Sequence, residues 1–287
     1  MTTLIEFFTT PLAYPFMQRA LIVSLLVAAV CAVLSCYLVL KGWSLMGDAV
    51  SHAVLPGIVL AFVLGLPLSV GAFAAALTCA TLTGYLKENS RLREDTVMGI
   101  VFSGMFGFGL VLFTKVDTDE HLNHILFGNL LGVTDAELTE IAVVAVLVLL
   151  VVLFRRRDLL LYCFDQQHAR AVGLPVRWLH YGLLVLLSVA IVAALKAVGI
   201  IHVMAMLVAP GATAYLITNR FDRMLLIAAL VAIGSGALGT LLSFHMDAAT
   251  GPAIVLLQAA IFVAALIVSR LRQSAVSDAT QVTDRAP

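Results

Sequence analysis

The sequence carries little charge, and this shortage excludes most classes of soluble protein. Only 12% of its 287 residues are Asp, Glu, Lys or Arg, while 62% are hydrophobic. A soluble globular domain has about 25% charged and about 45–50% apolar residues. The 17 basic and 17 acidic residues cancel, so no net field favours a polyanion such as nucleic acid. The composition therefore excludes a soluble enzyme, a nucleic-acid-binding domain and a disordered chain.

Motifs for ATP hydrolysis, zinc proteolysis and thiolate chemistry are also missing. The chain contains no GxxxxGK(S/T) phosphate-binding loop, no HExxH and no CxxC. Its four cysteines are Cys31, Cys36, Cys79 and Cys163, and we expect them to be small buried residues rather than disulfides or metal ligands. We predict that the chain is not an enzyme, and that any ATP driving it is hydrolysed by another polypeptide.

The sequence does contain long uncharged runs, at 20–40, 49–86, 96–114, 141–154, 178–195, 197–219, 224–246 and 248–269. A transmembrane helix needs about 20 apolar residues, and the run 49–86 is long enough for two, with a turn at residues 65–67. We predict an all-α polytopic transmembrane bundle of about nine spans over residues 1–272, followed by a disordered cytoplasmic tail over 273–287. The run 197–219 contains Pro210 and Gly211, so eight spans plus one re-entrant segment is the alternative.

Basic residues gather on one side of the membrane if the first span runs inward and the others alternate. The inner loops then hold 14 of the 17 Lys and Arg residues, and Arg19, Lys115 and Lys196 lie outside. Cytoplasmic loops of membrane proteins carry such an excess. We therefore predict an outer N-terminus, cytoplasmic loops at 87–95 and 155–177, and an acidic outer loop at 115–137.

Asp48 and His52, at the start of the second span, are the clearest candidates for chemistry. Ionisable residues at membrane depth are costly and are often functional, and a spacing of four places both side chains on one face of a helix. A carboxylate oxygen and an imidazole nitrogen suit a divalent metal ion, and Ser51 is a candidate supporting donor. A second copy in a symmetric or pseudo-symmetric dimer would supply a further carboxylate and imidazole, with water in the remaining positions. The alternative is that Asp48 caps the helix and that His52 is an ordinary buried histidine.

The loop between the fifth and sixth spans contains a second candidate region. Asp165 is placed to begin a short helix that runs to Val172, and Gly173 is placed to end it. Phe164, Ala169 and Val172 would give this helix an apolar face for a soluble motor subunit. The alternative is an interfacial helix held by lipid headgroups.

Three further histidines lie toward the outer side. His202, near the outer end of the run 197–219, is a speculative additional residue of a metal path. His121 and His124 lie beside Asp119 and Glu120 in the acidic outer loop, where a cation entrance competes with an ordinary solvated loop.

Five ordered sequence blocks resemble the permease subunits of bacterial ATP-binding-cassette importers for manganese, iron and zinc. The blocks are LMGDAVSHAVLPG at 45–57, KENSR at 87–91 with EDTVMG at 94–99, HILFGN at 124–129, Phe164 and Asp165 with Ala169 and Gly173, and VGI at 198–200 with APGATA at 209–214. The resemblance covers residues 15–272 and is strongest to the manganese/iron type. His202 departs from it, because an aliphatic residue is expected there.

This resemblance implies a multi-pass permease in the bacterial cytoplasmic membrane, in which Asp48 and His52 face the path of Mn²⁺ or Fe²⁺, with Zn²⁺ as an alternative. It implies no cofactor beyond the transported metal. It also implies a cytoplasmic ATP-binding subunit that contacts Phe164, Asp165, Ala169 and Gly173, and an extracytoplasmic metal-binding protein. The competing hypothesis is an ion-coupled secondary transporter for divalent metals, which would need no ATPase. An intramembrane metallohydrolase is a third class, against which the missing HExxH argues.

Overall fold

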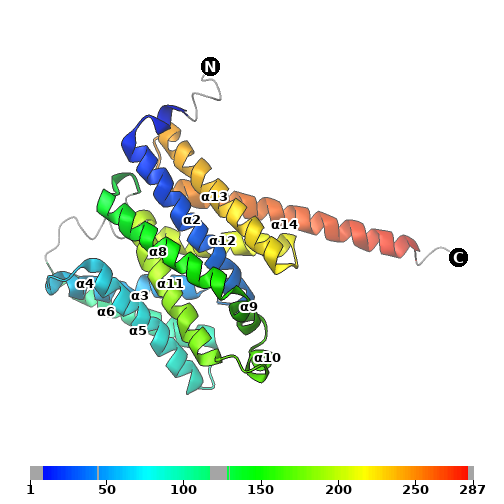
Figure 1. Ribbon diagram of the computed structural model, residues 1–287, viewed down its shortest axis with the longest axis horizontal. Coiled ribbons are helices and arrows are strands. Elements are labelled where there is room, and N and C mark those ends of the chain that lie inside the picture. Colours follow the sequence, from blue (N-terminus) through cyan, green and yellow to red (C-terminus); the bar gives the residue numbers. More distant parts are fainter. Residues whose placement is uncertain (1–8, 44, 117–127, 129, 284–287) are drawn as a thin grey trace.

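The computed structural model describes residues 9–43, 45–116, 128 and 130–283, and every regular element in this part of the chain is a helix (Figure 1). The elements are α2 (Pro15–Lys41), α3 (Met46–Ala53), α4 (Leu55–Val63), α5 (Leu68–Glu88), α6 (Glu94–Phe113), η1 (Leu130–Gly132), α8 (Asp135–Phe154), α9 (Arg156–Phe164), α10 (Gln166–Ala171), α11 (Val176–Val198), α12 (Ile200–Ile217), α13 (Phe221–Met246) and α14 (Thr250–Thr283).

Eight helical segments of the described residues are long and apolar enough to cross a membrane, and α3 and α4 together form one of them. A ninth, shorter apolar helix covers His202–Ile217 within α12. The predicted polytopic helical bundle is therefore confirmed. This shorter helix lies in the run with Pro210 and Gly211, for which a re-entrant segment stays a prediction.

Helix α12 continues through Pro210, and Ser35 of α2 forms hydrogen bonds with α12 on both sides of the proline. Proline has no N–H to donate within a helix. The Ser35 hydroxyl donates to the Val208 carbonyl at 3.1 Å and accepts from the Gly211 N–H at 2.8 Å. Such side-chain pairing is what permits a broken helix at membrane depth. Ser35 therefore joins α2 to α12 at the point where α12 is weakest.

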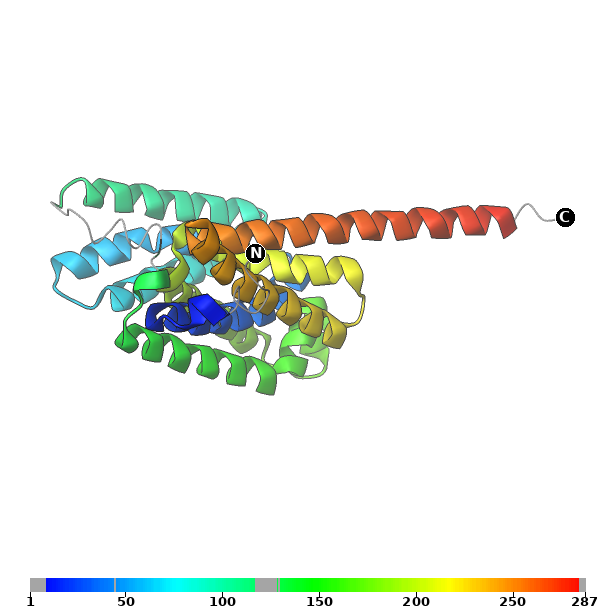
Figure 2. The same ribbon diagram turned by 90° about the horizontal axis from the view of Figure 1, so that it is seen from above.

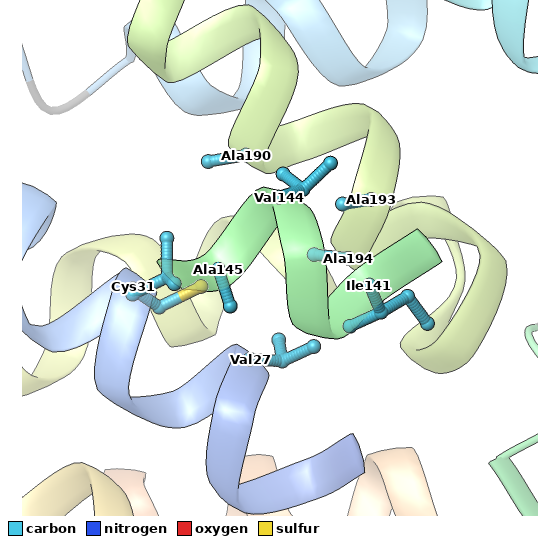
Figure 3. A pocket seen from close by; sticks show the side chains of 9 residues that line it. Val27, Cys31, Ile141, Val144, Ala145, Ala190, Ala193 and Ala194 are labelled. Atoms are coloured by element: carbon cyan, nitrogen blue, oxygen red, sulfur yellow. The ribbon is translucent and has the colours of Figure 1, made fainter. Parts of the chain in front are cut away.

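Helix α2 lies at the centre of the bundle and packs closely against its neighbours. It lies between α13, α12 and α8 (Figure 1). A void between α2, α8 and α11 has a volume of about 10 Å³ and an apolar lining that includes Val27, Cys31 and Ala145 (Figure 3). A water molecule needs about 10–15 Å³ and polar partners. The lining of this void therefore offers no polar partner to a water molecule or an ion.

Ion pairs join helix ends at both ends of the bundle. At one end, Arg19 Nε lies 2.8 Å from Asp135 Oδ1, and Lys196 Nζ lies 2.6 Å from Glu140 Oε2. At the other end, Arg156 Nη2 lies 3.1 Å from Asp222 Oδ1. Arg19 and Lys196, two of the three basic residues that the predicted orientation places outside, are thus ion-paired to the start of α8. This pairing gives a physical reason for their exception to the positive-inside rule.

The last helix extends beyond the predicted boundary of the membrane domain. The apolar span ends at Leu271, close to the boundary at 272, but α14 continues to Thr283 and projects away from the bundle (Figures 1 and 2). We expected a disordered tail from residue 273. The chain has no Gly or Pro between 273 and 283, so no strong helix breaker stops α14 there.

Candidate functional site

Asp48 and His52 meet on one face of α3. His52 Nε2 lies 3.2 Å from Asp48 Oδ1, and both side chains are about 30% exposed. The spacing of four residues therefore brings the two side chains together, as predicted. The capping alternative is not what the structure shows, because residue 45 is the N-cap position of α3 and no side chain makes a capping hydrogen bond there.

The helix that carries this pair ends directly after it. Helix α3 ends at Ala53, Val54 interrupts the helix, and α4 begins at Leu55 with Pro56 in its first turn. Pro56 has no N–H to donate, which accounts for the interruption between the two helices. Ser51 plays a different part from the one expected, because its hydroxyl donates to the Asp48 main-chain carbonyl at 2.9 Å and stabilises the helix rather than the carboxylate.

Two aromatic rings of α6 flank the imidazole. The His52 ring lies edge-on to Phe106 with centroids 5.3 Å apart, and Phe102 is 6.4 Å away. The pair thus combines a carboxylate oxygen and a ring nitrogen beside an apolar wall. Within the described residues no group of three or more His, Cys, Asp or Glu side chains could hold a metal ion. Among the described residues, one copy of the chain therefore brings together two candidate ligands here, the Asp48 carboxylate and the His52 imidazole.

His202, the other candidate histidine among the described residues, is not joined to this pair. His202 Nδ1 lies 3.0 Å from the Val198 carbonyl, and the ring packs against the backbone of Gly251. Its predicted role in the path remains a prediction. The roles predicted for His121, His124 and the nearby acidic residues 117–120 lie outside the described residues.

The loop after α8 folds into the two short helices α9 and α10, and its ends follow the sequence signals. Asp165 Oδ1 accepts hydrogen bonds from the backbone N–H groups of Gln167 at 2.9 Å and His168 at 3.0 Å, which caps α10. Gly173 follows α10 with φ of 86°, a conformation that glycine adopts readily. The predicted beginning and end of the helix are confirmed.

The exposed face of this loop differs from the predicted one. Ala169 is fully buried, whereas Phe164 is 80% and Val172 is 62% exposed. Ala169 therefore packs against the chain itself, and its side chain is not available to a partner. A helix of six residues has too few positions for its buried face to be assigned from apolar residues alone.

A buried aromatic cluster links α9 to the segment just before the Asp48–His52 pair. The Tyr162 hydroxyl lies 2.7 Å from His180 Nδ1, and the His180 ring is 5.3 Å from that of Trp43. Lys41 Nζ lies 4.5 Å from the centre of the Tyr162 ring, a cation–π contact. The sequence reasoning missed this cluster, because Trp43, Tyr162 and His180 are far apart in the chain. One signal in the sequence pointed to this cluster. Its members, Lys41, Trp43, Tyr162 and His180, all lie near the predicted cytoplasmic ends of spans.

We expect the thiol of Cys163, next to Tyr162, to be unreactive. Burial raises the pKa of its thiol to about 12, and the nearby Lys41 ammonium offsets this only in part. The thiolate is the reactive form of cysteine. The expectation of an inert buried cysteine at this position is thus consistent with its surroundings.

Comparison with known proteins gives one family over nearly the whole chain. The sequence profile described as the ABC 3 transport family matches residues 13–269. The chelated iron transport system membrane protein YfeD of Yersinia pestis is 61% identical over 272 residues, covering 95% of this chain and 92% of that protein. The manganese transport system membrane protein MntB of Synechocystis is 50% identical over 257 residues, covering 90% and 84%.

Two solved structures share the fold of this chain. The structure of PsaBC from Streptococcus pneumoniae in complex with Fab superposes with a TM-score of 0.82 at 37% identity, covering 92% of this chain and 95% of that one. An inward-facing metal-chelate type ABC transporter superposes with a TM-score of 0.68 at 20% identity, which supports the fold alone.

Proposed function

The chain is an integral membrane protein of the ABC 3 transport family, and we propose that it is the permease subunit of an ATP-driven importer for a divalent transition metal. Mn²⁺ and Fe²⁺ are the favoured cargo, in line with the names of its relatives, and Zn²⁺ is the alternative. The proposed location is the bacterial cytoplasmic membrane.

The Asp48–His52 pair is the observation that carries this proposal. An oxygen and a nitrogen ligand without thiolate suit Mn²⁺ or Fe²⁺, and the same ligands bind Zn²⁺. The carboxylate also offsets part of the metal's positive charge in a poorly solvated setting. Partial exposure of both side chains leaves them accessible to an ion.

The incomplete ligand set argues for a second permease subunit. Two ligands from one chain leave most of a metal's coordination sphere open. A second copy related by twofold symmetry, or a related permease, would supply a further carboxylate and imidazole, with water in the remaining positions. The transported metal is cargo in this proposal, and no resident cofactor is required.

Two soluble partners complete the proposed importer. The chain has no phosphate-binding loop for ATP, so a cytoplasmic ATP-binding subunit would hydrolyse it and would contact the exposed residues Phe164 and Val172 beside α10. An extracytoplasmic metal-binding protein would deliver the ion to the opposite end of the bundle.

Metal accumulation in bacterial cells tests the proposal. Cells that lack this subunit should accumulate less Mn²⁺ or Fe²⁺, and wild-type protein should restore uptake only when the ATP-binding subunit is catalytically competent. Restored uptake with an ATPase-dead partner would instead support an ion-coupled secondary transporter. Unchanged accumulation of both metals and of Zn²⁺ in the deletion strain would contradict the proposal itself.

A further inference from the structure

A groove of about 400 Å³ lies at the end of the bundle that carries α9. One wall is a single face of α9, formed by Arg157, Leu160, Leu161 and Phe164, which follow the i, i+3, i+4, i+7 spacing of one helix face. The opposite wall comes from the ends of the spans and includes Leu40, Tyr215 and Met224. The volume of the whole groove is within the range of about 300–1,000 Å³ that is typical of small-molecule clefts.

The helix ends around the groove indicate how deep in the membrane it lies. Helix α2 ends at Lys41, α12 ends at Ile217 and α13 begins at Phe221, so three helices end at the level of the groove. By the distribution of basic residues this end is cytoplasmic. The groove therefore opens where acyl chains meet the headgroups of the inner leaflet.

The three consecutive arginines at the start of the loop differ in their ion pairs. Arg155 Nη1 lies 3.1 Å from Asp158 Oδ2, and Arg156 is paired with Asp222. Arg157 has no acidic partner among the described residues, and its exposed side chain lines the groove. Arg220 and Arg223, at the start of α13, add exposed positive charge nearby.

We propose that this groove binds an anionic phospholipid of the cytoplasmic leaflet. The acyl chain lies against Leu160, Leu161 and Met224, and the phosphate pairs with Arg157. Inner-leaflet lipids are anionic, and basic pockets between transmembrane helices on the cytoplasmic side are suited to their headgroups. The lipid would fill the gap between α9 and the spans, and so brace the loop that also carries α10.

The walls of the groove favour a lipid over the ATP-binding subunit as its occupant. The back wall belongs to the ends of spans, whereas a soluble subunit reaches the residues that project beyond them, such as Val172, which is 62% exposed. Residues 157–161 of α9 then face the lipid, Val172 faces the motor subunit, and Phe164, the last residue of α9, borders both.

Native mass spectrometry of the full chain in detergent tests the proposal, with phosphatidylglycerol and phosphatidylcholine as the added lipids. The wild type should retain phosphatidylglycerol in preference to phosphatidylcholine. Arg157→Gln should lower this preference about fivefold, as expected for one basic residue at a lipid surface. Leu161→Trp should lower retention of both lipids, because the larger ring occupies the groove. Arg177→Gln is the matched control, since it removes an exposed charge at the same end but away from the groove.

Two results would overturn the proposal. Equal loss of preference in Arg157→Gln and Arg177→Gln would show general surface attraction instead of a groove. Unchanged lipid retention in Arg157→Gln, together with loss of co-purification of the ATP-binding subunit, would assign the groove to that subunit. Neither readout depends on which metal is transported, so failure here leaves the proposed function to its own test.

Discussion

Ser35 allows a sharp test of how the bundle tolerates Pro210. Its hydroxyl forms two hydrogen bonds with α12, to the Val208 carbonyl and from the Gly211 N–H. Ser35→Ala removes both of these bonds between α2 and α12 at membrane depth. Side-chain hydrogen bonds within membranes are worth about 0.6 kcal/mol on average and up to about 1.7 kcal/mol. We therefore expect Ser35→Ala to lower the free energy of unfolding by about 1–3 kcal/mol.

Ser24 provides a matched control on the same helix. Ser24 is also fully buried, but its hydroxyl has no hydrogen-bond partner among the described residues. Ser24→Ala removes an unpaired polar group, so it should be neutral or slightly stabilising. The assay is unfolding of the purified protein in mixed micelles with increasing dodecyl sulfate, followed by circular dichroism. Equal unfolding midpoints for Ser35→Ala and wild type, or a greater loss in Ser24→Ala, would refute the account of α12.

Three further predictions concern packing, reactivity and orientation. Gly211→Ala should destabilise the protein at least as much as Ser35→Ala in the same assay, because a Cβ there would lie 2.5 Å from Ser35 Oγ and 2.6 Å from its carbonyl oxygen; wild-type stability would contradict this. Cys163, whose pKa is raised to about 12, should stay protonated and unlabelled by a maleimide at pH 8 in the folded protein, and rapid labelling would contradict its burial. Single cysteines placed by Asn89→Cys and Gln166→Cys in a cysteine-free background should resist an impermeant thiol reagent in spheroplasts, whereas Asp119→Cys should react; labelling of Gln166→Cys from outside would invert the orientation.

The local features of the site were predictable from the sequence. The four-residue spacing of Asp48 and His52 determines their proximity once the segment is helical, and the break at Pro56 follows from the missing N–H. Asp165 and Gly173 are cap and stop signals that act within a few residues, so the sequence was sufficient to place α10. These features depend on neighbours along the chain and not on the rest of the bundle.

The features that were missed depend on which side of each helix faces protein. In a membrane, lipid and protein core are both apolar, so hydrophobic periodicity does not distinguish the two faces of a span. The contact of Ser35 with Gly211 therefore could not be predicted from the pattern. The burial of Ala169 was missed because α10 has only six residues. The meeting of Tyr162, His180 and Trp43 was missed because it depends on which helices the topology brings together. Long-range ion pairs such as Arg19–Asp135 are hidden for the same reason, since the topology alone brings them together.

Metal uptake by cells that carry Asp48→Ala or His52→Ala tests the central claim most directly. At equal membrane insertion and equal co-purification of the ATP-binding subunit, we predict that each variant lowers Mn²⁺ or Fe²⁺ uptake by about 100-fold, to the level of cells lacking the subunit. Thr78→Ala, an exposed position on α5, should keep wild-type uptake. Wild-type rates in both site variants would show that the ion does not pass this pair.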